Sequence, residues 1–168
     1  MSYEVRDALV HENTHQHLIA TWANLIFAIF KKETTLAGVQ KVRQAYERSW
    51  RLNPNGLCTM MIVEPRAPMP GAEVRKALAE ALAVGSGRTL MSAVIHEGSG
   101  FHASAVRSVV TGLAMLTRLP FPHQVFATVR DAANWMAKNP ACGTDAVSIL
   151  RVVQDTRLQV SQFAERNR

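Results

Sequence analysis

The sequence predicts an α/β protein in which a mixed β-sheet of about five strands packs against helices. Short apolar runs typical of covered strands, at residues 57–63 and 90–95, alternate with segments whose apolar residues recur every three or four positions. Glycine and proline clusters separate these segments. Because strands and helices alternate along the chain, we expect helices on the faces of the sheet.

The composition is that of a folded protein without an obvious nucleic-acid partner. The chain has 168 residues, of which 48% are hydrophobic and 19% charged, within the range of globular domains. Its net charge of +6 would suit a polyanion. However, acidic residues such as Glu33, Glu47 and Asp131 are interspersed among the basic ones, so no basic patch is predicted.

The termini and cysteines predict a cytoplasmic location. Residues 1–17 carry several charges and contain no apolar segment of the kind found in signal peptides. The apolar stretch 18–30 is shorter than the roughly 20 residues of a membrane span. Cys58 and Cys142 are far apart and form no C-x-x-C motif, so neither a disulfide framework nor a zinc knuckle is expected.

A β-hairpin is expected to open the protein. Residues 3–10 predict a first strand and residues 18–30 a long second strand that needs cover on both sides. Thr34 or Thr35 is the candidate N-cap of a helix that ends at residues 53–56. Its inner face is predicted to comprise Leu36, Val39, Val42 or Arg43, Tyr46 and Trp50.

The central part predicts two strand–helix units. The strand at 57–63 is followed by a loop with three prolines at 64–71 and a helix over 72–84. The strand at 90–95 is followed by a glycine-containing turn and a helix from Phe101. We expect the proline-rich loop and the glycine turn to lie at the same edge of the sheet.

The C-terminal part predicts a last strand and two helices. Residues 123–129 form the strand, and Thr128 is expected to cap a short helix. This would complete a domain over residues 1–138, followed by a segment 139–168 with a linker at 139–143 and a helix capped by Thr144. The wide apolar face of that helix must dock either on its own domain or on another chain, which would be a partner protein or a second copy in a homodimer.

The element order resembles that of the STAS domain, the fold of bacterial anti-sigma-factor antagonists. The closing segment 125–136, VFATVRDAANWM, is similar to the strand, short turn and helix with a Trp-Leu pair that close many STAS-like chains. The resemblance covers residues 3–138 and implies a non-enzymatic bacterial regulatory protein that acts through protein–protein contact. It assigns no catalytic residue and no cofactor.

The resemblance also implies where a partner would bind. The surface would comprise the loop after the third predicted strand, with Glu64, Arg66, Pro68 and Met69, and the neighbouring turn at 96–102. In the sporulation-type members an Asp-Ser-Ser-Gly loop carries a phosphorylated serine, whereas residues 64–69 contain no hydroxyl group. A phosphorylation switch is therefore not carried over to this loop. From the residues alone, Glu64 and Arg66 could equally form a surface ion pair.

The turn after the strand at 90–95 supports two alternative functions. Free backbone N–H groups at a helix start can bind an anion, so a small anionic ligand or nucleotide could bind at His96, Gly98, Ser99, Gly100 and His102. The turn lacks the third glycine of a dinucleotide fingerprint and the lysine of a P-loop. A hydrolase using Ser99 and a nearby histidine is the other alternative, but the G-x-S-x-G elbow is absent.

A histidine-rich segment lies near the N-terminus. His11, His15 and His17, with Glu12, have the side-chain types that bind zinc or nickel. A polar turn that happens to contain histidines explains the same residues, and we favour that interpretation. We therefore predict no metal site.

Overall fold

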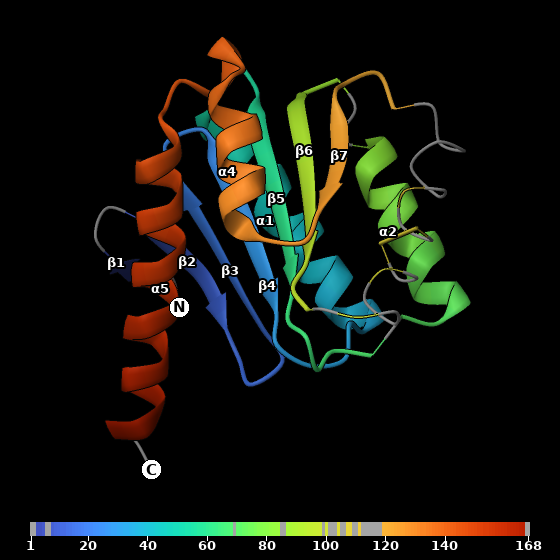
Figure 1. Cartoon of the computed structure of the whole chain (residues 1–168), viewed down its shortest axis with the longest axis vertical. Coiled ribbons are helices and arrows are strands. Elements are labelled where there is room, and N and C mark those ends of the chain that lie inside the picture. The colour runs from blue at the N-terminus through green and yellow to red at the C-terminus, as the bar shows by residue number, and fades with distance from the viewer. Residues whose placement is uncertain are drawn as a thin grey trace.

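The structure, a computed structural model, describes residues 3–5, 8–68, 70–84, 87–98, 100, 104, 107–108, 111 and 119–166. Side chains are described within these ranges except at 3–5, 82–84 and 160–166. The chain is an α/β protein with a mixed sheet, helices packed on it and a C-terminal helix, as predicted (Figure 1).

Seven strands form one sheet in the order β1 to β7. They are β1 (Tyr3–Val5), β2 (Ala8–Asn13), β3 (His17–Trp22), β4 (Leu25–Phe30), β5 (Leu57–Val63), β6 (Thr89–His96) and β7 (His123–Phe126). The helical elements are α1 (Leu36–Leu52), α2 (Ala72–Val84), α4 (Val129–Ala137), the 3₁₀ turn η1 (Pro140–Cys142) and α5 (Ala146–Arg166). The predicted helix from Phe101 lies largely outside the described residues.

The N-terminal region has four antiparallel strands where the sequence predicted two. The predicted strand 18–30 turns back on itself, with Trp22 paired to Leu25. Ala23 makes this turn possible because it adopts a left-handed conformation with φ of 49°. No glycine or proline marks the turn, and the flanking residues are apolar on both sides, which explains why it was missed.

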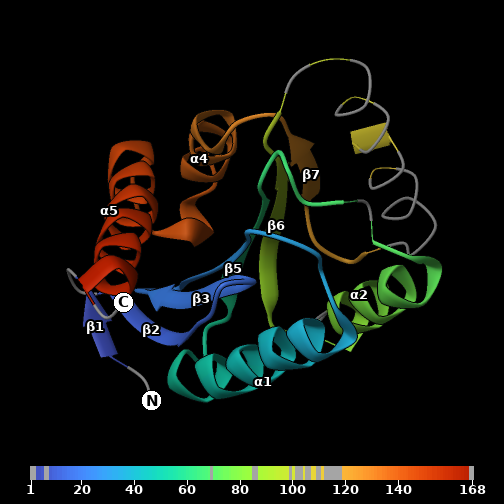
Figure 2. The same ribbon diagram turned by 90° about the horizontal axis from the view of Figure 1, so that it is seen from below.

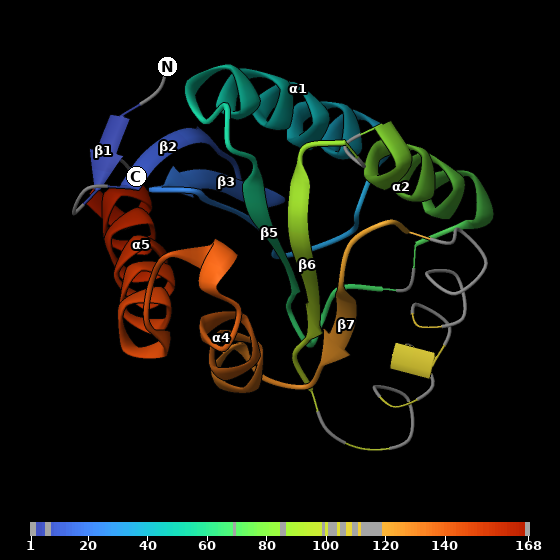
Figure 3. The same ribbon diagram turned by 90° about the horizontal axis from the view of Figure 1, so that it is seen from above.

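The parallel half of the sheet contains the strands predicted at 57–63, 90–95 and 123–129, although the last of these ends earlier, at Phe126. β4, β5, β6 and β7 pair in parallel and in sequence order. Each new parallel strand is added on the same side of the previous one, and right-handed crossovers of this kind place their helices on one face of the sheet. Figure 2 shows α1 and α2 together on one side of the sheet, with α4 and α5 on the other. The view from the opposite side shows the same two layers (Figure 3).

The centre of the sheet is buried on both faces. In β4, Leu25, Phe27 and Ile29 belong to the apolar cluster that contains α4 and α5 residues. Ile26, Ala28 and Phe30 belong to the cluster that contains α1 residues. Because successive side chains of a strand point to opposite faces, a continuous apolar run such as β4 is what a strand covered on both sides requires.

Hydroxyl and carboxylate side chains define the helix starts. The Thr35 side chain caps α1 by accepting a hydrogen bond from the Gly38 N–H at 3.1 Å, and Thr128 caps α4, both as predicted. For α5 the predicted cap, Thr144, was wrong. Asp145 accepts from the Ser148 N–H at 2.9 Å instead, and a carboxylate is additionally favoured there by the helix dipole.

The described part of α5 docks on its own chain. Ile149, Val152 and Val153 are buried in the cluster shared with β4 and α4, and Thr156 is fully buried. The described part of the α5 face that prompted the homodimer hypothesis is thus covered by its own chain. Within the described part of the chain, none of the helices combines the length and apolar character that crossing a bilayer requires.

Candidate functional site

The proline-rich loop and the glycine turn begin at the same edge of the sheet, as expected. Val63 and His96, the last residues of β5 and β6, are paired. The Glu97 N–H donates to the Val63 carbonyl at 2.9 Å, and the Glu64 N–H donates to the Phe30 carbonyl at 3.0 Å. We call this region, where β4, β5 and β6 end, the carboxyl edge.

The proline-rich loop is braced by its own chain. The Ala67 N–H donates to the Glu64 carbonyl at 3.0 Å, and the Ala67 side chain is buried. The Arg75 guanidinium, one turn into α2, donates to the Pro70 carbonyl at 2.9 Å. Because prolines also restrict the backbone, the loop loses little conformational entropy when it binds a partner.

Two of the four predicted partner-binding residues of this loop, Arg66 and Pro68, are exposed. Pro65, Arg66 and Pro68 are exposed, whereas Glu64 is half-buried, and Met69 lies outside the described residues. Among the described residues, no ion pair involves Arg66, so the alternative of a Glu64–Arg66 pair is not realised. The loop therefore presents an arginine to solvent.

The glycine turn is held by two arginines from elsewhere in the chain. Arg157 of α5 donates to both carboxylate oxygens of Glu97, at 3.1 and 2.9 Å, a two-point geometry that is stronger than a single contact. The Arg107 guanidinium donates weakly to the His96 and Gly98 carbonyls, both at 3.4 Å. The oxygen atoms at the end of β6 are therefore paired with the guanidinium groups of Arg107 and Arg157.

The predicted ligand residues are only partly described. His96 is buried, with 3% of its surface exposed. Gly98 and Gly100 have φ values of 145° and 88°, which favour glycine. Ser99 and His102 lie outside the described residues, so the placement of the hydrolase candidates is not defined.

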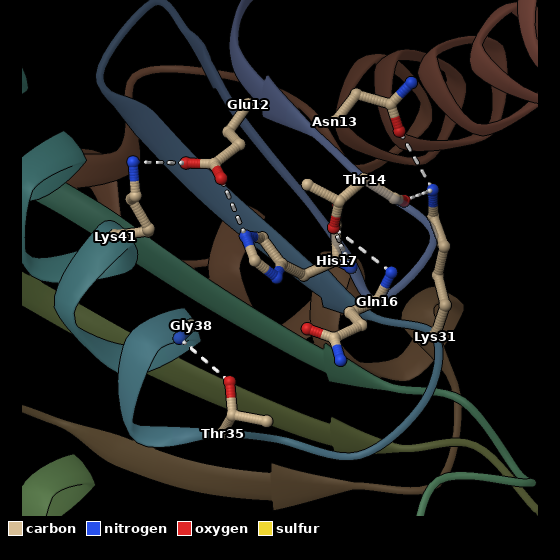
Figure 4. A network of polar contacts seen from close by, with 9 residues as sticks. All are labelled: Glu12, Asn13, Thr14, Gln16, His17, Lys31, Thr35, Gly38 and Lys41. Carbon is tan, nitrogen blue, oxygen red and sulfur yellow. Dashed lines mark hydrogen bonds and ion pairs between the residues drawn. The ribbon is translucent and has the colours of Figure 1, made fainter.

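A polar network joins the β2–β3 turn to the start of α1 (Figure 4). The Glu12 carboxylate lies between His17, at 3.4 Å, and Lys41, at 3.7 Å. Lys31 donates to the Asn13 side chain at 3.0 Å and to the Thr14 carbonyl at 2.9 Å. Burial lowers the pKa of Lys31, and the nearby Glu64 carboxylate opposes this effect.

The histidines near the N-terminus do not converge. His11 contacts the Thr21 hydroxyl at 2.6 Å, and Thr21 in turn contacts the Ser49 hydroxyl of α1 at 3.0 Å. Ser49 is 1% exposed. These hydrogen bonds therefore connect the sheet to α1, and the Ser49 hydroxyl is not accessible as a nucleophile. His15 is exposed. The described residues contain no group of three or more potential metal-binding side chains.

Acidification is expected to destabilise the fold through His11 and His123. Burial, with Arg48 as a second cause, lowers the pKa of His11 below 6.5, and burial lowers that of His123. As the pH falls below 6.5, the unfolded chain binds protons before the folded chain does. Stability is therefore full above this pH and declines below it, by at most about 1.4 kcal/mol per pH unit for each histidine.

Urea unfolding between pH 7.5 and 5 measures this effect. The double variant His11→Gln/His123→Gln should show a flatter dependence, whereas His15→Gln, at an exposed position, should retain the wild-type slope. Equal slopes in all three proteins would contradict the assignment.

Sequence reasoning missed the residues that brace the carboxyl edge. Arg157 lies 60 positions from Glu97, and Lys31 reaches back to the β2–β3 turn. No local motif signals such contacts, because they arise only when α5 and the first hairpin are placed beside the edge.

Comparison of the chain with protein-family models, with curated proteins and with solved structures finds no significant match.

Proposed function

We propose that the chain is a non-enzymatic, cytoplasmic, bacterial-type regulatory or scaffolding domain, STAS-like in fold, that binds another protein through the carboxyl edge. One observation carries the proposal. Arg66 is exposed, without an ion-pair partner among the described residues, on a loop that is braced from both sides. Arginine is enriched among the residues that dominate protein interfaces.

The topology of the sheet favours this function over the binding of a small anionic ligand. In open α/β sheets, ligands bind in the crevice formed where the strand order reverses. The order from β1 to β7 contains no reversal. In addition, Arg157 and Arg107 already donate to the Glu97 carboxylate and to the carbonyl groups of His96 and Gly98, so these guanidinium groups are less available to an anion.

The burial of α5 supports a contact at the carboxyl edge over one on α5. The inner face of α5 is covered by its own chain as far as the side chains are described. On its outer face, the exposed Val147 and Leu158 are separated by the exposed polar residues Arg151 and Gln154. Self-association of the chain through the carboxyl edge remains compatible with the proposal.

Charge reversal at Arg66 tests the proposal. Tagged wild-type chain, Arg66→Glu and Arg88→Glu would be used to capture proteins from cells that naturally express the chain, with quantification by mass spectrometry. Light scattering at several concentrations would measure self-association. We expect Arg66→Glu to reduce capture of a defined partner, or dimer formation, by about tenfold or more.

Arg88→Glu is the matched control. Arg88 is an exposed loop arginine directly before β6, at the other end of the strands from the carboxyl edge. The charge change is therefore identical, and only its position differs. Both variants should unfold within about 0.5 kcal/mol of the wild type, as surface substitutions do. Equal retention of every partner by the two variants would overturn the proposal.

A further inference from the structure

Two buried thiols that are distant in the sequence lie next to each other. Cys58 is the second residue of β5, and Cys142 is the last residue of η1. Both are fully buried, belong to the same apolar cluster and are free thiols. The two side chains also interact, because each thiol is the first cause of the shift in the pKa of the other.

Asn24 holds both cysteine-bearing segments in place. Its carbonyl accepts a hydrogen bond from the Cys58 N–H at 2.8 Å, and its side-chain amide donates to the Ala141 carbonyl at 2.9 Å. η1 is closed locally, because the Asn139 side chain accepts from the Ala141 N–H at 3.0 Å and the Cys142 N–H donates to the Asn139 carbonyl at 2.9 Å. The proximity of the thiols is therefore supported by the backbone on both sides.

We propose that Cys58 and Cys142 form a dithiol that a small-molecule disulfide oxidises reversibly to an intramolecular disulfide. This bond would fasten η1, and with it the connection between α4 and α5, to β5. Because α5 supplies Arg157 to Glu97, the cross-link would act on an element that braces the carboxyl edge.

The exchange consists of two balanced steps. The Cys142 thiolate attacks one sulfur of oxidised glutathione, which forms a mixed disulfide and releases one glutathione thiolate. The Cys58 thiolate then attacks the Cys142 sulfur and displaces the second glutathione thiolate. Two electrons pass from the protein to the glutathione disulfide, and the two thiol protons end on the two released glutathione molecules.

The surroundings determine the order of attack and the route of access. The hydrogen bond from Cys58 lowers the pKa of Cys142, and the same bond, with burial, raises that of Cys58. Cys142 is therefore the first nucleophile, since the thiolate is the reactive form. It also lies on the three-residue turn η1, outside the central sheet and followed by Gly143 with a φ of 64°, so we expect glutathione to reach it when η1 opens.

Redox titration tests the proposal. Wild-type chain and Cys142→Ser would be equilibrated with reduced and oxidised glutathione at stepped ratios, alkylated in acid and analysed by intact mass and peptide mapping. We expect the wild-type monomer to lose two hydrogens and to yield a peptide that links Cys58 to Cys142, reversibly with dithiothreitol. The oxidised form should melt at a temperature higher by on the order of 10 °C, because a long loop is closed.

Cys142→Ser, which cannot form the bond, is the control. Cys142→Ser should melt at the same temperature in oxidising and reducing buffer; if it does not fold, Cys142→Ala takes its place. A wild-type chain that remains a dithiol, or that gives only glutathione adducts or intermolecular disulfides, would overturn the proposal. So would an oxidised form that is less stable than the reduced form.

Discussion

Replacing Ile149 by alanine is expected to lower the free energy of unfolding by about 2–5 kcal/mol. Ile149 is fully buried in the cluster that α5 shares with β4 and α4. The substitution removes buried methyl groups and leaves a cavity that neighbouring side chains fill only in part. The better helix propensity of alanine offsets less than about 0.7 kcal/mol of this loss.

Val147→Ala provides a matched control within the same helix. Val147 is 65% exposed, so its truncation should change stability by no more than about 0.5 kcal/mol. Urea unfolding at two widely separated protein concentrations would measure both variants. A loss at Ile149 that is independent of concentration indicates docking within one chain. Equal effects at the two positions, or a loss that depends on concentration, would show that this face of α5 packs elsewhere.

Gly56→Ala is expected to lower the free energy of unfolding by about 2–4 kcal/mol. Gly56 precedes β5 with a φ of 98°, and an added Cβ would lie 2.9 Å from the Arg88 carbonyl oxygen and from the Leu90 side chain. The same carbonyl accepts the Leu57 N–H at 2.9 Å. The methyl group would therefore strain the backbone and separate β5 from β6 at the start of their pairing.

Gly71→Ala tests whether this effect is specific to its position. Gly71 precedes α2, and an added Cβ would meet no atom within 4 Å. We expect its stability to fall by no more than about 1 kcal/mol. Alanine restricts the unfolded chain more than glycine does, but it is the poorer residue at this helix start, where the Gly71 carbonyl accepts from the Arg75 N–H. Thermal and urea unfolding of the two variants provide the comparison. Similar stability of both would refute the proposed close approach at Gly56.

Local patterns predicted the regular elements of the parallel half of the chain. The bounds of β5 and α2 and the N-caps Thr35 and Thr128 agree with the sequence analysis. Each depends on information within a few residues: apolar periodicity, a hydroxyl at a helix start, or a glycine and proline cluster. The common edge of the two candidate loops followed as well, because parallel neighbouring strands end on the same side.

The sequence alone was less informative where a single residue changes the path of the backbone. The turn at Ala23 and Asn24 interrupts an apolar stretch without a glycine or proline, so one predicted strand became β3 and β4. The cap of α5 shifted from Thr144 to Asp145, a difference of one position between two residues that both cap helices well.

Residue types, spacing and alternation by themselves determined the α/β class, the boundaries of β5, β6 and α2, and the candidate loops of this protein, because these features act within one strand or helix. Only the tertiary structure decided that α5 covers its own sheet, that Arg157 binds Glu97 and that Cys58 meets Cys142. These contacts join segments far apart in the chain, and their energies depend on how helices and strands pack in three dimensions. No local pattern encodes that packing.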